Sequence, residues 1–118
     1  MKSRGMQIMA IDGYHEDGWC HPLVRATARA LNNASKASAV VWIKPEPGVE
    51  AVDGLFKIQE APGIAFRIPV GQPAEIESPV DLLPGQEFSI TLMCAHRVIE
   101  RGEDRRDLSF ALLDLGLS

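Results

Sequence analysis

Hydrophobic and polar residues alternate along this chain with a period of two, in short segments. In the clearest case, alternate positions of Phe88–Val98 are largely apolar, while polar residues such as Ser89 and Thr91 occupy most of the other face. The segment Ile64–Val70 repeats this pattern, and Pro69 within it predicts an edge strand because proline has no N–H for the hydrogen-bond ladder. This alternation predicts strands that bury one face.

Three further segments fit strands of the same kind. Leu23–Leu31 alternates small apolar residues with polar ones, although its alanines and the preceding Pro22 also fit the start of a helix. Ser38–Lys44 and Leu108–Leu117 are continuous apolar runs, which are typical of strands near the middle of a sheet. The last run changes phase near Asp114, which predicts a β-bulge.

Turn residues recur so often that long helices are excluded over most of the chain, because glycine and proline interrupt helical hydrogen bonding. The signals are Asn32-Asn33, Pro45–Gly48, Asp53-Gly54, Pro62-Gly63, Gly71–Pro73, Pro84-Gly85 and Arg101-Gly102.

The 118 residues fit one domain. We predict an all-β, single-domain antiparallel β-sandwich over residues 1–118, immunoglobulin-like or jelly-roll-like, with about seven or eight strands. For residues 1–6, disorder or a tag-like segment is an alternative to a place in the domain. Cys20, Trp42 and Cys94 stand in the order that immunoglobulin domains use, but Leu92 lies where their tyrosine is expected. We therefore reject a true immunoglobulin domain and keep the sandwich.

Composition limits the partners of the chain. The formal charge of −4 argues against nucleic-acid binding, which depends on clustered Lys and Arg. No stretch reaches the roughly 20 apolar residues of a membrane span, and no apolar signal region follows the first residues. We expect a cytoplasmic chain with reduced, unjoined cysteines and with neither a metal nor a cofactor.

Two short motifs resemble a known module. Gly13–Trp19 reads Gly-Tyr-His-Glu-Asp-Gly-Trp, and Asp104, Arg106 and Leu108 form an Asp-x-Arg-x-Leu pattern before the last apolar run. Both resemble an all-β, carbohydrate-binding-like module found beside bacterial glycosyltransferase domains that build surface polysaccharides. The resemblance implies a glycan-recognition or accessory role in polysaccharide biosynthesis, with a saccharide or a glycosyltransferase domain as the partner.

Each motif also has a structural explanation. Asp104 and Arg106 share one face of an extended segment, so they can join the last strand to a neighbouring loop through charge-assisted hydrogen bonds. Trp19 can close the end of the sandwich or offer its face to a sugar ring, and the same choice applies to Tyr14. Trp42 lies in an apolar run, which favours the core.

The polar residues around Trp19 could take part in binding. His15, Asp17 and His21, together with Tyr14 and Trp19, are our candidate ligand-binding residues, because they combine hydrogen-bonding groups with aromatic faces. Their spacing matches no metal or hydrolase motif, so a solvated turn at Asp17-Gly18 is the simpler interpretation. Calcium binding through the acidic residues of this stretch stays open.

Three classes of function remain. The first is a non-catalytic glycan-recognition module. The second is a structural domain that pairs with a partner or with itself through a sheet edge. The third, a small enzyme, has the least support, because no catalytic motif is present.

Overall fold

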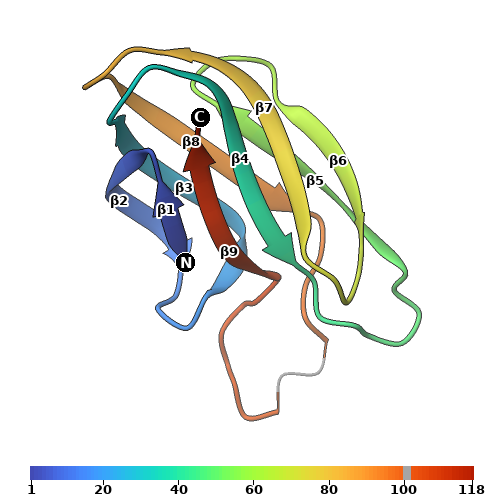
Figure 1. Cartoon of the computed structure of the whole chain (residues 1–118). Coiled ribbons are helices and arrows are strands. Elements are labelled where there is room, and N and C mark those ends of the chain that lie inside the picture. Colours follow the sequence, from blue (N-terminus) through green and yellow to red (C-terminus); the bar gives the residue numbers. More distant parts are fainter. Residues whose placement is uncertain (100–101) are drawn as a thin grey trace.

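The computed structural model describes residues 1–99 and 102–118, and within them it contains nine strands in two facing layers (Figure 1). The predicted turn at Arg101-Gly102 begins outside the described residues. The strands are β1 (Lys2–Arg4), β2 (Met6–Tyr14), β3 (Trp19–Ala30), β4 (Ala34–Trp42), β5 (Ala51–Ile58), β6 (Ile64–Pro69), β7 (Ala74–Leu82), β8 (Glu87–Cys94) and β9 (Phe110–Leu117).

One layer has the order β2-β3-β8-β5-β6, and the other has the order β1-β9-β4-β7. The first residues of β3 join the layers, because Trp19 pairs with Ala111 and Cys20 with Phe110. All pairings are antiparallel except the one between β1 and β9, which is parallel. The predicted all-β sandwich is confirmed.

The core lies between the layers and is built from the inward phase of the strands. The inward-facing residues of the predicted strand segments are buried or half-buried: Ile68, Phe88, Ile90, Leu92, Leu108 and Phe110 are buried, and Phe66 is half-buried against the core. Leu23–Leu31 lies in β3 almost throughout, so the helical alternative is wrong. Pro69 lies in β6, at one end of the strand order, as predicted. A bulge falls at Leu113, because Val40 pairs with Asp114 while Val41 pairs with Leu112.

Two parts of the chain differ from the sequence expectations. Asp53-Gly54 forms no turn but lies inside β5, where a side chain at Gly54 would approach the carbonyl oxygen of Met93 to 2.4 Å. Glycine is there because β6 and β8 pack closely against it, and not because the chain turns. Residues 1–6 take part in the fold, since β1 pairs with β9 and Met6 is buried in the core.

Several connections gather at one end of the sandwich, at the bottom of Figure 1. They are the β2–β3 turn, the β4–β5 and β6–β7 segments, and the described residues between β8 and β9 (95–99 and 102–109). We call this region the loop end. The turns at Asn32-Asn33 and Pro84-Gly85 lie at the opposite end.

Candidate functional site

The β2–β3 turn starts the site. The N–H of Gly18 donates to the carbonyl oxygen of His15 at 2.9 Å, and the N–H of His15 donates to that of Trp19 at 2.9 Å. Gly18 has a φ of 94°, which favours glycine because it has no side chain to clash. The predicted turn at Asp17-Gly18 therefore sets the positions of Asp17 and Trp19 on either side of it.

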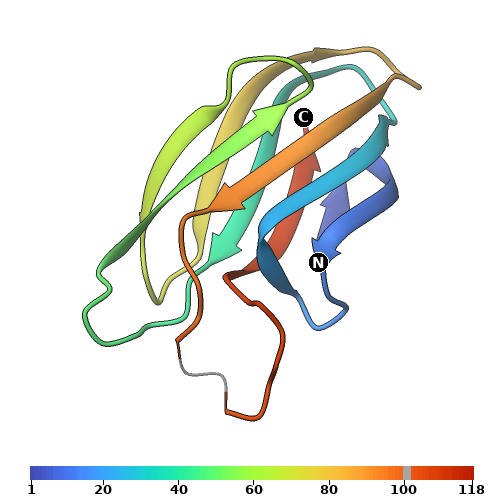
Figure 2. The same ribbon diagram turned by 180° about the vertical axis from the view of Figure 1, so that it is seen from behind.

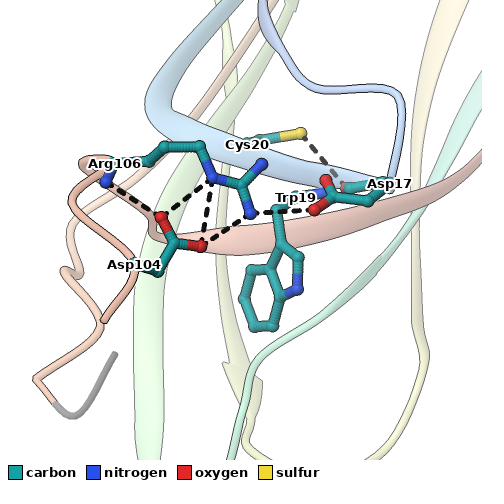
Figure 3. A network of polar contacts seen from close by, with 6 residues as sticks. Asp17, Trp19, Cys20, Asp104 and Arg106 are labelled. Atoms are coloured by element: carbon teal, nitrogen blue, oxygen red, sulfur yellow. Dashed lines mark hydrogen bonds and ion pairs between the residues drawn. The ribbon is translucent and has the colours of Figure 1, made fainter. Parts of the chain in front are cut away.

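Arg106 joins this turn to the segment before β9 (Figure 3). Its Nη2 donates to Asp17 Oδ2 at 2.8 Å and to Asp104 Oδ2 at 2.7 Å, and its Nε donates to Asp104 Oδ1 at 3.0 Å. The backbone N–H of Arg106 also donates to Asp104 Oδ1 at 3.0 Å. The expected charge-assisted contact is therefore present. It joins the segment before the last strand, β9, to the β2–β3 turn.

Asp17 links Arg106 to Trp19 through hydrogen bonds of its two carboxylate oxygens. Its Oδ1 accepts the backbone N–H of Trp19 at 3.2 Å, while its Oδ2 accepts from Arg106. The hydrogen bond from Arg106 is the main cause that lowers the pKa of Asp17 below its ordinary value. The hydrogen bonds that Arg106 donates to Asp104 and then to Asp17 raise the pKa of Arg106, so Arg106 and Asp17 are both ionised at neutral pH.

Trp19 packs against Trp42 on the outer side of the second layer. Both residues pair with Ala111, one from β3 and the other from β4, so their side chains emerge on the same face. The ring centroids are 6.1 Å apart at an interplanar angle of 66°, an edge-to-face contact. Both residues are half-buried, so Trp42 is not the fully buried core residue that its apolar surroundings favoured.

The other candidate residues separate into two groups. Tyr14 pairs with Cys20, whose side chain points into the core, so Tyr14 lies on the opposite face from Trp19. Its hydroxyl accepts the N-terminal amine of Met1 at 3.0 Å. His15 and His21 contact each other, with ring centroids 5.0 Å apart. Tyr14 and Trp19 therefore do not form one aromatic surface.

A second group of contacts links the segments of the loop end, and no sequence pattern predicted it. Glu46, from the β4–β5 segment, is buried, and its two carboxylate oxygens accept the N–H of Ile99 at 3.2 Å. Its Oε1 also lies 3.8 Å from Nε2 of His96. This carboxylate ties the β4–β5 segment to the residues that follow β8.

Metal-ligating side chains are not brought together in the described part of the chain, where no group of three or more His, Cys, Asp or Glu could hold an ion. Cys20 and Cys94 are both free and buried, and burial raises the pKa of each thiol to about 12. Among residues 1–99 and 102–118 there is also no helix that could cross a membrane.

Comparison with known proteins relates the chain to others by structure alone. No protein-family model matches the sequence, and no curated protein matches it. A family 35 carbohydrate-binding module from an environmental isolate superimposes with a TM-score of 0.51 and 14% identity, over 97% of this chain and 86% of that module. An exo-β-1,3-galactanase from Phanerochaete chrysosporium, solved with galactose, matches 91% of this chain with a TM-score of 0.47 and 14% identity. The chain spans 24% of the galactanase.

The fold thus belongs to the all-β, jelly-roll-like class that includes carbohydrate-binding modules. Its loop end combines two adjacent tryptophans with a hydrogen-bonded Asp-Arg-Asp cluster.

Proposed function

We propose that this chain is a non-catalytic glycan-recognition module, and that a saccharide binds at the loop end against Trp19 and Trp42. The observation that supports this most is the tryptophan pair, half-exposed and adjacent on one face. A sugar ring presents apolar C–H faces that pack on aromatic planes, and its hydroxyls need charged or polar partners. Asp17, whose side chain is 49% exposed, lies two residues from Trp19 and can accept hydrogen bonds from such hydroxyls.

The two motifs support a setting in polysaccharide synthesis in the bacterial cytoplasm. Arg106 joins the Gly13–Trp19 motif to the Asp104–Leu108 motif, so the two segments that resemble the glycosyltransferase-associated module form one structural unit. In this setting the module holds the glycan, while a separate transferase domain performs the chemistry.

The two other classes of function have less support from the geometry. The outermost strands are β2 and β6 in one layer and β1 and β7 in the other. β6 and β7 each contain a proline, Pro69 or Pro79, that opposes pairing with another strand, and β1 has only three residues. For an enzyme, two carboxylates of the loop end are poorly placed, because Arg106 engages both Asp17 and Asp104. A carboxylate that is paired with a guanidinium and has a lowered pKa, as Asp17 has, is unsuited to act as a general acid.

Tryptophan fluorescence provides a direct test. The chain has only two tryptophans, and both lie at the proposed site, so the emission reports on this site alone. We expect a saturable change in emission with at least one member of a panel of bacterial oligosaccharides. Trp19→Ala should abolish saturation, with Trp42 still present as the reporter.

The matched control is Leu83→Ala, because Leu83 is 63% exposed and lies in the turn before Pro84-Gly85, at the opposite end of the sandwich. This variant should bind as the unmodified chain does. Absence of a saturable response to every sugar at millimolar concentration, or an unchanged response in Trp19→Ala, would contradict the proposal.

A further inference from the structure

A shallow trough of about 370 Å³ crosses the outer face of the five-stranded layer, over β2, β3 and β8. Figure 2 shows β3 and β8 of this layer in front. The trough exists because three small side chains lie in one line across the strands: Ala10 pairs with Thr27, and Thr27 pairs with Ser89. Its floor therefore presents two hydroxyl groups.

Longer side chains form the wall on one side of the trough. On one side, Asp12 pairs with Arg25, and Arg25 pairs with Thr91, which also faces Lys57 of β5. Two cationic side chains thus stand on either side of the Thr91 hydroxyl.

An ion pair lies beyond the other side of the trough. Arg29 Nη2 donates to Glu87 Oε1 at 3.0 Å, and this pair occupies the neighbouring cross-strand position. Gln59 closes the β5 end of the line, where its amide oxygen accepts the N–H of Ser89 at 3.2 Å.

The path of β2 contributes to the trough. Ala10–Asp12 lies between two register shifts against β3, one between Ile8 and Ala10 and one between Asp12 and Tyr14. Bulges of this kind change the direction of side chains and are frequent beside binding sites. Here they return the small Ala10 to the outer face and place Asp12 opposite Arg25.

The charged side chains in and beside the trough differ in their contacts. Arg29 is held by Glu87, whereas Arg25 and Lys57 make no hydrogen bond or ion pair within the part of the chain that the structure describes. Asp12 lies opposite Arg25 but forms no ion pair with it, so the donors of both cations are available to a ligand, and both cations border a line of hydroxyls. A planar guanidinium can donate two parallel hydrogen bonds to a carboxylate, which gives Arg25 a preference for that anion.

We propose that this trough is a second ligand site, independent of the loop end, and that it binds a sugar that carries a carboxylate. Arg25 binds the carboxylate, and Lys57 adds positive charge beside it. The hydroxyls of Thr27, Ser89 and Thr91, with the carboxylate of Asp12, exchange hydrogen bonds with the ring hydroxyls. A phosphate shares the negative charge but has tetrahedral geometry, so the test below separates the two anions.

The test is a nuclear magnetic resonance titration of isotope-labelled protein with glucuronic acid, with glucose as the uncharged match and with inorganic phosphate as the other anion. We expect glucuronic acid to move the amide signals of Thr27, Ser89 and Thr91, and glucose and phosphate to move them much less. Arg25→Gln should weaken glucuronic acid binding about tenfold or more, because a hydrogen bond to a charged group is lost. Lys36→Gln, an exposed cation on β4 in the other layer, should leave binding unchanged.

If glucose causes the same shifts as glucuronic acid, the trough does not recognise the carboxylate. If phosphate causes the same shifts, the trough shows only a general anion effect. Each result overturns the proposal. So would signals that stay fixed up to about 50 mM, a range that covers the weak binding expected of a shallow site. The amides of Thr27, Ser89 and Thr91 report on the trough and tryptophan emission reports on the loop end, so either site can fail without the other.

Discussion

Arg106 contacts two carboxylates that come from different segments of the chain. Asp104 lies two residues away, so its contact follows from local spacing, but Asp17 is 89 residues away. Only the fold brings Asp17 into reach, which is why the sequence predicted the local pair and not the full cluster. The consequence for the site is that Trp19, through its backbone hydrogen bond to Asp17, depends on a residue near the end of the chain.

The pKa of Asp17 measures this dependence. We expect it to lie below 3.8, its unperturbed value, and to return toward 3.8 in Arg106→Ala, where the main donor is lost. Because the folded-state pKa is lowered, the stabilisation is fully present above the unfolded-state pKa and is lost as the pH falls through the folded value. The check is a carboxyl-detected titration of the native protein and of the variant.

Arg106→Ala should also lower the midpoint of chemical denaturation at neutral pH and much less at a pH at which Asp17 is protonated in the native protein. Arg67→Ala is a suitable control, because its ion pair with Asp53 is exposed and is remote from β9. If Asp17 has the same pKa in Arg106→Ala and in the unmodified chain, the contact between Arg106 and Asp17 does not stabilise the fold.

At the scale of elements, strands with a regular sequence pattern were predicted, whereas strands interrupted by a bulge or a proline were not. Segments of β3, β6 and β8 were predicted because their inward phase is continuous, and segments of β4 and β9 because they are continuous apolar runs. The bulge near Met9 in β2 and Pro79 in β7 break that phase, so these strands gave no clear signal. In the same way, the contact of Trp19 with Trp42 depends on the register of β3 and β4 against Ala111, which no local pattern reports.

Gly54 in β5 gives a test of strand packing. In Gly54→Ala the new Cβ would lie 2.1 Å from Cζ of Phe66 and 2.4 Å from the Met93 carbonyl oxygen, so β6 or β8 must shift. We expect a loss of about 2–3 kcal/mol in the free energy of unfolding, as for other overpacked sites. The measurement is equilibrium denaturation.

The neighbouring Asp53→Ala is the control, because it removes only an exposed ion pair and should cost about 0–1 kcal/mol. Equal stability of Gly54→Ala and the unmodified chain would show that β5 is not packed as closely as the structure indicates.

At the scale of the whole molecule, both cysteines are sealed inside the sandwich. Burial raises the pKa of both thiols to about 12, so almost no thiolate forms near neutral pH. We expect neither thiol to react with an aromatic disulfide reagent in the native protein, and both to react after unfolding without reductant. Two unreactive sites in the unfolded chain would show that Cys20 and Cys94 are joined.

The central claim, that the loop end recognises a glycan, is tested most directly by mapping the bound ligand on the protein. The measurement is a nuclear magnetic resonance titration of labelled protein with a panel of bacterial oligosaccharides, repeated on Trp19→Ala. The account predicts that at least one sugar moves the indole and amide signals of Trp19 and Trp42 together with the amides of the β2–β3 turn, and that Trp19→Ala removes these shifts. If no spectrum changes at millimolar sugar, or if every shift lies far from the loop end, the glycan-recognition site is wrong.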